Sequence, residues 1–300
     1  MHIEFSEPID CLCDFTYNFY WQHKGSLLSP SDVIPHQIDT SYRYQDLVFA
    51  LKKGEEVKIK GNTGKRLGSS LGVDLKFFGG TGRSIPAGTI IVDGDVDTRM
   101  GISMVSGAIY VKGNIKQPMG NVIEVASDRQ GYRKFISVTD MLNDHPDEKI
   151  LHPNVMENGC IYLRDGIIRD TIAARLDADR KVFVEGDAGM STGILMKRGF
   201  IQIEGDSGLN TAVLLRGGTI ITNNSGEFAG AYMKDGTLII QGKAKGYVGA
   251  NMKGGRIYYK GEAMVPGFHV DEKEIRMIVR LLNISQVEAM MFKRYFIEKI

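Results

Sequence analysis

The residues with the clearest potential for chemistry form a GxSxG pentapeptide, Gly68-Ser69-Ser70-Leu71-Gly72. In esterases this pattern places a nucleophilic serine on a tight turn between a strand and a helix. No helical pattern follows Ser70 here, and Gly68 and Leu71 also fit a repeat that runs through the chain. A stand-alone esterase that uses Ser70 is therefore a second alternative and not the leading hypothesis.

Two glycine-rich segments partly match nucleotide-binding loops. Gly80-Thr81-Gly82 lacks the third glycine of a dinucleotide-binding turn, and residues 61–66 (GNTGKR) lack the spacing and the Ser or Thr of a phosphate-binding loop. Of the six histidines, only His145 and His152 lie close in sequence, and no clustered ligand supports a metal pair there. We predict no catalytic, cofactor-binding or metal-binding residue in this chain.

Two groups of polar residues are candidates for a stripe along one face. Acidic or amide side chains recur after glycines, at Asn62, Asp95, Asn114, Asp187 and Asp206. Side chains of this type bond backbone groups at turns, and stacked amides can form ladders. Four cations could line a route or contact a partner, namely Lys65, Arg66, Arg83 and Arg99. Bonding of the backbone at turns is the simpler interpretation of the first group, and a solvated face is the simpler interpretation of the four cations.

The composition indicates a globular protein without an obligatory polyanionic partner. The chain has 300 residues, 43% of them hydrophobic, and a net charge of +1. We therefore expect no nucleic-acid or membrane partner. No apolar run is long enough to span a bilayer and the first residues do not resemble a signal peptide, so we expect a cytoplasmic protein. Three cysteines without metal-ligand spacing, Cys11, Cys13 and Cys160, predict buried or free thiols.

The 36 glycines follow a repeat of about 18 or 19 residues. Each unit has a short β-branched run that ends in Gly or Asn, a second glycine seven positions later, and a large apolar residue three positions further on. The glycine pairs include Gly61 with Gly68, Gly94 with Gly101, Gly113 with Gly120, Gly186 with Gly193 and Gly242 with Gly249. The apolar positions are Leu71, Met104, Leu176, Met196, Leu215, Met233 and Met252.

Stacking explains this pattern physically. Strands of only a few residues cannot stand alone, but coils stacked about 4.8 Å apart pair with their neighbours and bury the repeated apolar residue as an internal ladder. Glycines at the corners let successive backbones approach closely. The sequence therefore predicts an all-β chain whose main part is a right-handed parallel β-helix.

The repeat also defines the expected domains. Residues 1–54, with a helical pattern that ends before Gly54, are predicted to form an N-terminal α/β cap, and residues 55–264 the β-helix. An insertion at 121–159 lacks the glycine spacing and is predicted to leave the coil from one corner. In the tail, 265–300, Asp271 with Glu274 and Ser285 with Glu288 predict two capped helices that cover the last rung.

The unit GDAGMSTGILMKRGFIQIEG, which begins at Gly186, resembles the GXGXG domain. That family includes the C-terminal β-helix of the glutamate synthase large subunit and the GXGXG-domain subunit of formylmethanofuran dehydrogenase. The resemblance covers roughly residues 61–262. The segment GNTGKRLGSSLGVDLKFFGGTG looks more like the free-standing archaeal glutamate synthase domain, whereas GDVDTRMGISMVSGAIYVKGN looks equally like the formylmethanofuran dehydrogenase member.

The resemblance implies a non-catalytic structural or tunnel-lining subunit of a multisubunit oxidoreductase. In the glutamate synthase type, glutamine amide nitrogen reaches 2-oxoglutarate, and the partners would be a glutaminase and a synthase with FMN and iron–sulfur clusters. In the alternative, the GXGXG-domain subunit of formylmethanofuran dehydrogenase or a paralogue, catalytic partner chains would hold molybdopterin or tungstopterin. No catalytic residue is carried over, and the segments outside the repeat are expected to select the partner.

Overall fold

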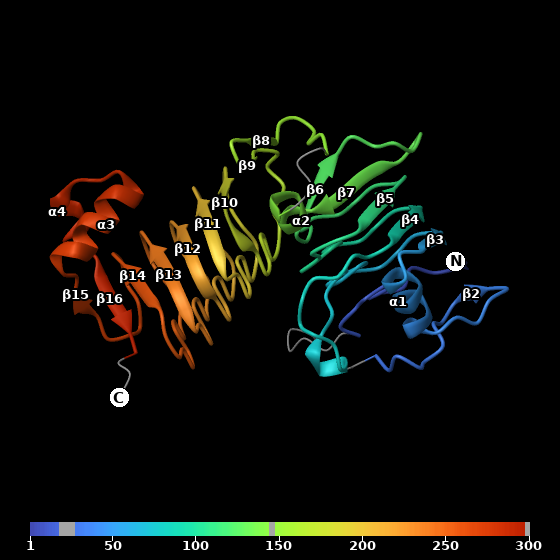
Figure 1. Cartoon of the computed structure of the whole chain (residues 1–300), viewed down its shortest axis with the longest axis horizontal. Helices are drawn as coiled ribbons and strands as arrows, with labels where there is room; N and C mark the ends of the chain where they lie inside the picture. The colour runs from blue at the N-terminus through green and yellow to red at the C-terminus, as the bar shows by residue number, and fades with distance from the viewer. Residues whose placement is uncertain (18–27, 144–147, 298–300) are drawn as a thin grey trace. The chain divides into compact units, whose positions relative to one another are not determined.

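A computed structural model describes residues 1–17, 28–143 and 148–297 of the protein. The chain divides into two compact units, residues 1–155 with 167–174 and residues 156–166 with 175–300. Both consist mainly of short parallel strands stacked as successive coils (Figure 1). The predicted parallel β-helix with C-terminal helices is therefore confirmed.

In the described part of the first unit, one sheet has the strand order β2-β1-β3-β4-β5-β7-β6. The strands that stack in parallel are β1 (His2–Phe5), β3 (Glu56–Lys60), β4 (Thr89–Asp93) and β5 (Ala108–Val111). The strands that pair antiparallel are β2 (Gln37–Ile38), β6 (Val122–Val125) and β7 (Arg133–Ser137). The helices are α1 (Tyr44–Lys52), α2 (Val138–Asn143) and the 3-10 turn η1 (Lys76–Phe78).

The second unit has the strand order β15-β16-β14-β13-β12-β11-β10-β9-β8. Its strands are β8 (Val155–Glu157), β9 (Cys160–Leu163), β10 (Asp177–Val184), β11 (Arg198–Ile203), β12 (Arg216–Thr222), β13 (Asp235–Ile240), β14 (Arg256–Tyr259), β15 (Phe268–His269) and β16 (Lys293–Phe296). Strands β9 to β14 are parallel, whereas β16 pairs antiparallel with β14 and β15. The helices are α3 (Glu272–Leu282) and α4 (Gln286–Ala289).

The coil interiors are packed with apolar side chains. Register pairs Val182 with Ile201 and Ile220 with Leu238, and each of these side chains is fully buried. The predicted ladder of Leu71, Met104, Leu176, Met196, Leu215, Met233 and Met252 is buried to at least 96% at every position. The ladder prediction is confirmed.

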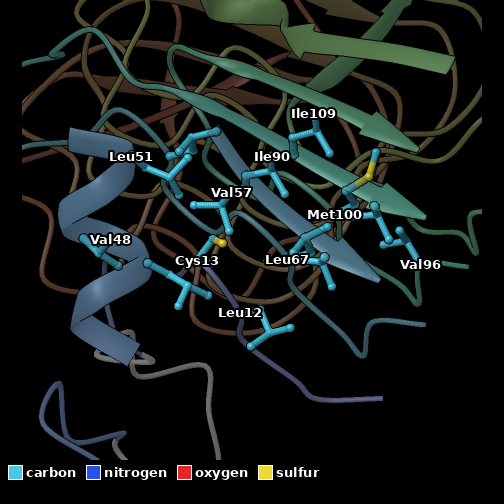
Figure 2. Packing of buried hydrophobic residues seen from close by; sticks show 14 of the residues in the cluster. Leu12, Cys13, Val48, Leu51, Val57, Leu67, Ile90, Val96, Met100 and Ile109 are labelled. Atoms are coloured by element: carbon cyan, nitrogen blue, oxygen red, sulfur yellow. The ribbon is translucent and has the colours of Figure 1, made fainter. Parts of the chain in front are cut away.

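The first unit contains a coil that the glycine pattern did not reveal. Strand β1 pairs in parallel with β3, the Cys11 N–H donates to the Lys65 carbonyl at 2.8 Å, and the Gly68 N–H donates to the Leu12 carbonyl at 2.9 Å. Leu12 and Cys13 point into the same apolar cluster as Leu67 of the next coil (Figure 2). Stacking therefore begins near residue 2, inside the segment predicted as a cap.

Most coils contain a turn ribbon, a stretch in which three alternate residues have positive φ. In the coil around Gly230 these are Phe228, Gly230 and Tyr232, at φ of 60°, 69° and 55°. The Ala231 N–H donates to the Phe228 carbonyl at 3.0 Å and the Met233 N–H donates to the Gly230 carbonyl at 3.2 Å, so consecutive tight turns overlap. The middle residue is the second glycine of the repeat, and the sequence pattern did not predict its left-handed neighbours.

The C-terminal segment closes the second unit differently from the prediction. Strand β16 pairs with β14, and helix α3 packs Ile275 and Ile278 against the outer sides of Ile221, Ile239 and Tyr258. The Asp271 capping box of α3 is present, as predicted. The apolar residues of the second predicted helix, Val287, Met290 and Met291, are 74%, 59% and 59% exposed, so they do not cover the coil. The edge of the last coil strand, β14, is therefore covered by the strand β16 and not by the helices.

The insertion at 121–159 supplies β6, β7, α2 and β8. Strand β7 pairs antiparallel with β5, so the insertion ends the parallel stacking of the first unit. Inside this segment, the buried Asn121 amide donates to the Met104 carbonyl and to the Thr139 hydroxyl, both at 2.8 Å. The insertion is thus hydrogen-bonded into the coil and forms part of the sheet.

Close backbone stacking yields a stability prediction at Gly120. A Cβ atom there would lie 2.2 Å from the Ile102 backbone nitrogen. We expect Gly120→Ala to lower the free energy of unfolding by about 1–3 kcal/mol, because rigid backbone must move. Urea unfolding measures the change. Gly246→Ala is the control, since a Cβ atom there meets nothing within 4 Å; equal losses in the two variants would contradict the prediction.

Candidate functional site

The first unit carries a surface cavity of about 600 Å³ on the outer side of its sheet. Side chains alternate along β5, so Ile109 and Val111 fill the coil while Ala108 and Tyr110 face the cavity. Strand β7 contributes Lys134, opposite Tyr110 in the register. The other lining residues are Ser84, Ile85, Pro86, Ala87, Thr89, Ser106, Gly107, Ile136, Asp140 and Glu148.

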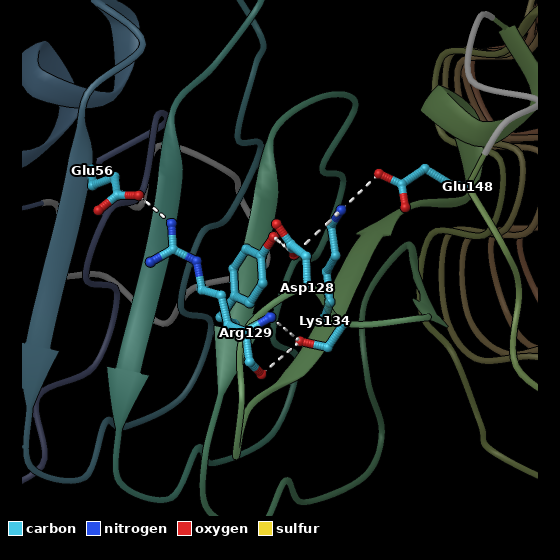
Figure 3. Close-up of polar contacts among 7 residues, drawn as sticks. Glu56, Asp128, Arg129, Lys134 and Glu148 are labelled. Carbon is cyan, nitrogen blue, oxygen red and sulfur yellow. Dashed lines mark hydrogen bonds and ion pairs between the residues drawn. The ribbon is translucent and has the colours of Figure 1, made fainter.

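Lys134 and Glu148, which line this cavity, belong to a network of charges (Figure 3). The Tyr110 hydroxyl donates to Asp128 Oδ1 at 2.6 Å, and Lys134 Nζ donates to Glu148 Oε1 at 2.7 Å. Asp128 Oδ1 is 3.9 Å from Lys134 Nζ, which therefore lies near two carboxylates. Arg129 stacks over the Tyr110 ring at 4.8 Å and pairs with Glu56.

The surroundings set the charge states of this network. Burial disfavours the Lys134 ammonium, but its hydrogen bond to Glu148 and the nearby negative groups raise its pKa above the usual value. The hydrogen bond from Tyr110 lowers the pKa of Asp128. Burial and the bond to Asp128 raise the pKa of Tyr110. At neutral pH the Lys134 ammonium therefore lies between the carboxylates of Asp128 and Glu148. This arrangement suits binding of charged or hydrogen-bonding groups.

Sequence reasoning did not find this site. Its charged residues come from β3, the turn before β7, β7 itself and the segment after α2, and no local spacing connects them. The one available signal was that residues 121–159 are charged and lack the repeat. The sequence predicted only that such segments select the partner.

The Lys134 side chain gives a second prediction. It is 13% exposed, whereas Lys112, which pairs with Asp93 at 3.0 Å, is 54% exposed. Lys134→Met should lower stability at pH 7 by about 1–3 kcal/mol, because it leaves Glu148 and Asp128 without their shared cation. Because the folded-state pKa of Lys134 is raised, its contribution is complete below the unfolded pKa and is lost as pH rises through the folded value.

Lys112→Met is the matched control and should lower stability far less than Lys134→Met, since water screens its exposed ion pair. Thermal and urea unfolding at pH 7 compare the two variants. A loss at Lys112 as large as that at Lys134 would show that burial of the Lys134 ion pair contributes no extra stability.

The acidic and amide side chains of the candidate stripe form a hydrogen-bonded ladder within each unit. Asn62 Oδ1 accepts from the Asp95 N–H at 2.8 Å, and Asp95 Oδ1 accepts from the Asn114 N–H at 2.7 Å. In the second unit, Asp187 accepts from Asp206, Asp206 from Asn224, and Asn224 from Lys243, at 2.8, 3.1 and 2.7 Å. Each side chain thus accepts the backbone N–H of the following coil.

This ladder predicts a difference between two substitutions of Asp206. Its Oδ1 also accepts from the side chains of Asn223 and Asn224. Asp206→Ala should cost about 1 kcal/mol of unfolding free energy, because these donors lose their partner. Asp206→Asn keeps an acceptor oxygen, as Asn62 and Asn224 do, and should cost less than half as much by urea unfolding. Equal losses would mean that the ladder bond does not contribute.

The esterase candidate Ser70 lies at the third left-handed position of its turn ribbon, at φ 53°. Its side chain is fully buried, and its hydroxyl has no hydrogen-bond partner among the described residues. No described histidine bonds to it. A substrate would reach Ser70 only after the coil opened, so the geometry gives no support to hydrolysis.

The other sequence candidates have structural partners or lie apart. Thr81 donates from its N–H and hydroxyl to Asp74, and the Lys65 N–H donates to Asp10. In both glycine-rich loops these donors are therefore bonded to a carboxylate of the protein itself. Arg66 is buried, and Arg99 Nε pairs with Asp170 at 2.9 Å. Lys65 and Arg83 are exposed. Nothing brings these four cations into one route.

The remaining predictions concern metals, thiols and membranes. His145 lies outside the described residues, and His152 is exposed. Within the described ranges, no group of three or more His, Cys, Asp or Glu could hold a metal ion. All three cysteines are free, and burial raises the pKa of Cys11 to about 12. No helix in the described part of the chain has the length and apolar character to span a bilayer.

Fold and site together define a parallel β-helix protein with a filled interior and an elaborated outer surface. No protein-family model matches the chain. It is similar to a protein of Methanothermobacter thermautotrophicus, with 51% identity over 203 residues, which are 68% of this chain and 65% of the relative. The match thus spans slightly less than two thirds of that relative, which is described as an uncharacterized protein.

Proposed function

We propose that this chain is a non-catalytic structural subunit of a multisubunit enzyme of the glutamate synthase type. In such an enzyme the glutamine amide nitrogen passes to 2-oxoglutarate, and the glutaminase and FMN-containing synthase reside on partner chains. The GXGXG-like unit at residues 186–205 motivates this assignment. A similar protein in an archaeon agrees with the resemblance to free-standing archaeal domains.

The observation that carries the proposal is the rigid, filled coil. Strand residues such as Val182 and Ile220 occupy the interior together with the Met and Leu ladder, and all are at least 96% buried. Each coil is also hydrogen-bonded to the next on the strand side and on the turn side. Such a stack resists compression and holds whatever binds to successive coils at fixed spacing, which suits a scaffold.

The filled interior also specifies how a tunnel-lining role would work. A route for ammonia cannot run through the coils, because apolar side chains occupy that volume. The wall of a route would therefore be the outer surface of a unit, closed by a partner protein. The lined cavity beside Tyr110 and Lys134 is one surface that a partner would have to cover or extend.

The alternative proposal, the GXGXG-domain subunit of formylmethanofuran dehydrogenase or a paralogue, rests on the coil at residues 94–114. Its sequence, GDVDTRMGISMVSGAIYVKGN, fits that enzyme as well as it fits glutamate synthase. Both assignments use the same physical property of the fold. They differ in the cofactors of the partners, which are FMN and iron–sulfur clusters in one case and molybdopterin or tungstopterin in the other.

Gentle affinity purification of the full-length tagged chain from its native cells tests the proposal. We expect a glutaminase and an FMN-containing synthase to co-purify in fixed ratio, identified by mass spectrometry and flavin absorbance. A molybdopterin or tungstopterin protein in their place would favour the alternative. A chain that elutes without any stoichiometric partner would contradict both assignments.

A further inference from the structure

The turn ribbons of the second unit carry exposed apolar side chains. Leu209, Tyr232 and Tyr247 are 43%, 49% and 64% exposed. The rings of Phe228 and Tyr247 stack across adjacent coils, with centroids 4.7 Å apart and planes 8° from parallel. Leu214 precedes Tyr232 at the corresponding position of the preceding coil and is half-buried. We call these five residues the turn-ribbon patch.

Four of the five patch residues have a backbone conformation that is unfavourable for their side chains. Their φ angles lie between 55° and 61°, at Leu214, Phe228, Tyr232 and Tyr247. Non-glycine residues rarely adopt this left-handed region, and bulky ones are least suited to it, whereas Asn tolerates it better. The chain itself places Asn at equivalent positions, Asn210 and Asn251. Folding alone would therefore favour Asn over tyrosine or leucine here.

Unpaired cations border the patch on one side. Arg216, Lys234 and Lys253 each follow the buried ladder residue of their coil, and the Lys234 N–H donates to the Leu215 carbonyl while the Lys253 N–H donates to the Met233 carbonyl. All three side chains are exposed, and within the described residues none makes an ion pair. Like charges on adjacent rungs repel one another. These three cations are therefore available to pair with carboxylates of another molecule.

We propose that the turn-ribbon patch is a docking surface for a partner protein that presents an apolar ridge flanked on one side by carboxylates. Exposed aromatic and aliphatic side chains supply the buried centre of such an interface, and the cation row supplies its rim. The patch covers three coils, two spacings of about 4.8 Å, so it is about 10 Å long and matches about seven residues of an α-helix. The inference goes beyond the scaffold function and holds for either partner enzyme.

The experiment uses the full chain and a fluorescein-labelled synthetic peptide of 14 residues, helical by design, with Leu along one face and Glu beside it. We expect fluorescence anisotropy to show binding that a matched peptide with Lys in place of Glu does not show. The double variant Tyr232→Asn, Tyr247→Asn should bind the acidic peptide at least about tenfold more weakly. Its Tm should be equal to or higher than that of the wild type, because Asn relieves the left-handed strain.

Val287→Asn is the control, since Val287 is 74% exposed on α4 and lies outside the patch; its peptide affinity should be unchanged. Equal binding of both peptides, or unchanged affinity in the double variant, would overturn the assignment. A wild-type dimer in sedimentation that the double variant dissolves would overturn it in favour of a second copy. Tighter binding of single-stranded RNA than of the acidic peptide would also overturn it. None of these results bears on co-purification with a glutaminase.

Discussion

Hydrogen bonding between successive coils is the interaction on which the rest of this structure depends. On the strand side β12 and β13 pair in parallel, with one register shift between Arg216 and Thr219. On the turn side a second set of bonds runs through the ribbons, such as that from the Gly230 N–H to the Thr211 carbonyl at 2.8 Å. Both sets require the backbones to approach within hydrogen-bond distance. At Gly113 and Gly120 a Cβ atom would meet the backbone of the preceding coil at 2.5 and 2.2 Å, so glycine permits the approach there. Close stacking therefore explains the composition as well as the fold.

The same constraint determines what the sequence could predict. Glycine spacing and the ladder of Met and Leu follow directly from stacking, so the β-helix and its buried ladder were predictable. The first coil was not, because Cys13 occupies the position that glycine holds at Gly68 and removes the periodic signal. The cavity network was also not predictable. Tyr110, Asp128, Lys134 and Glu148 meet only because the insertion pairs β7 with β5, and that pairing has no local sequence signal.

Inside and outside positions of a coil are under different physical demands. Interior residues must match their neighbours above and below, which explains why ladder residues vary only between Met and Leu. Corner residues have a second role, because the side chains of Asp95, Asp206 and Asn224 bond the next coil and so hold the register. The first left-handed position of the ribbons varies in side chain, from the buried Ser191 and Asn210 to Phe228 and Tyr247. Variation at these positions leaves the stack intact, so they can acquire binding roles.

Strain helps to separate these roles further. The middle left-handed residue of a ribbon faces an opposing strand. At Gly101, for example, a Cβ atom would lie 2.3 Å from a methyl carbon of Val122. Packing therefore requires a small residue at this position. The flanking left-handed positions accept larger side chains, such as those of Arg99, Asn210 and Tyr247. Packing of the coil does not explain why a side chain such as that of Tyr247, for which the left-handed conformation is unfavourable, occupies a flanking position. The coil fixes the backbone first and tolerates the strain because hydrogen bonds on both sides determine each ribbon. Function can therefore be added to the ribbons without altering the fold.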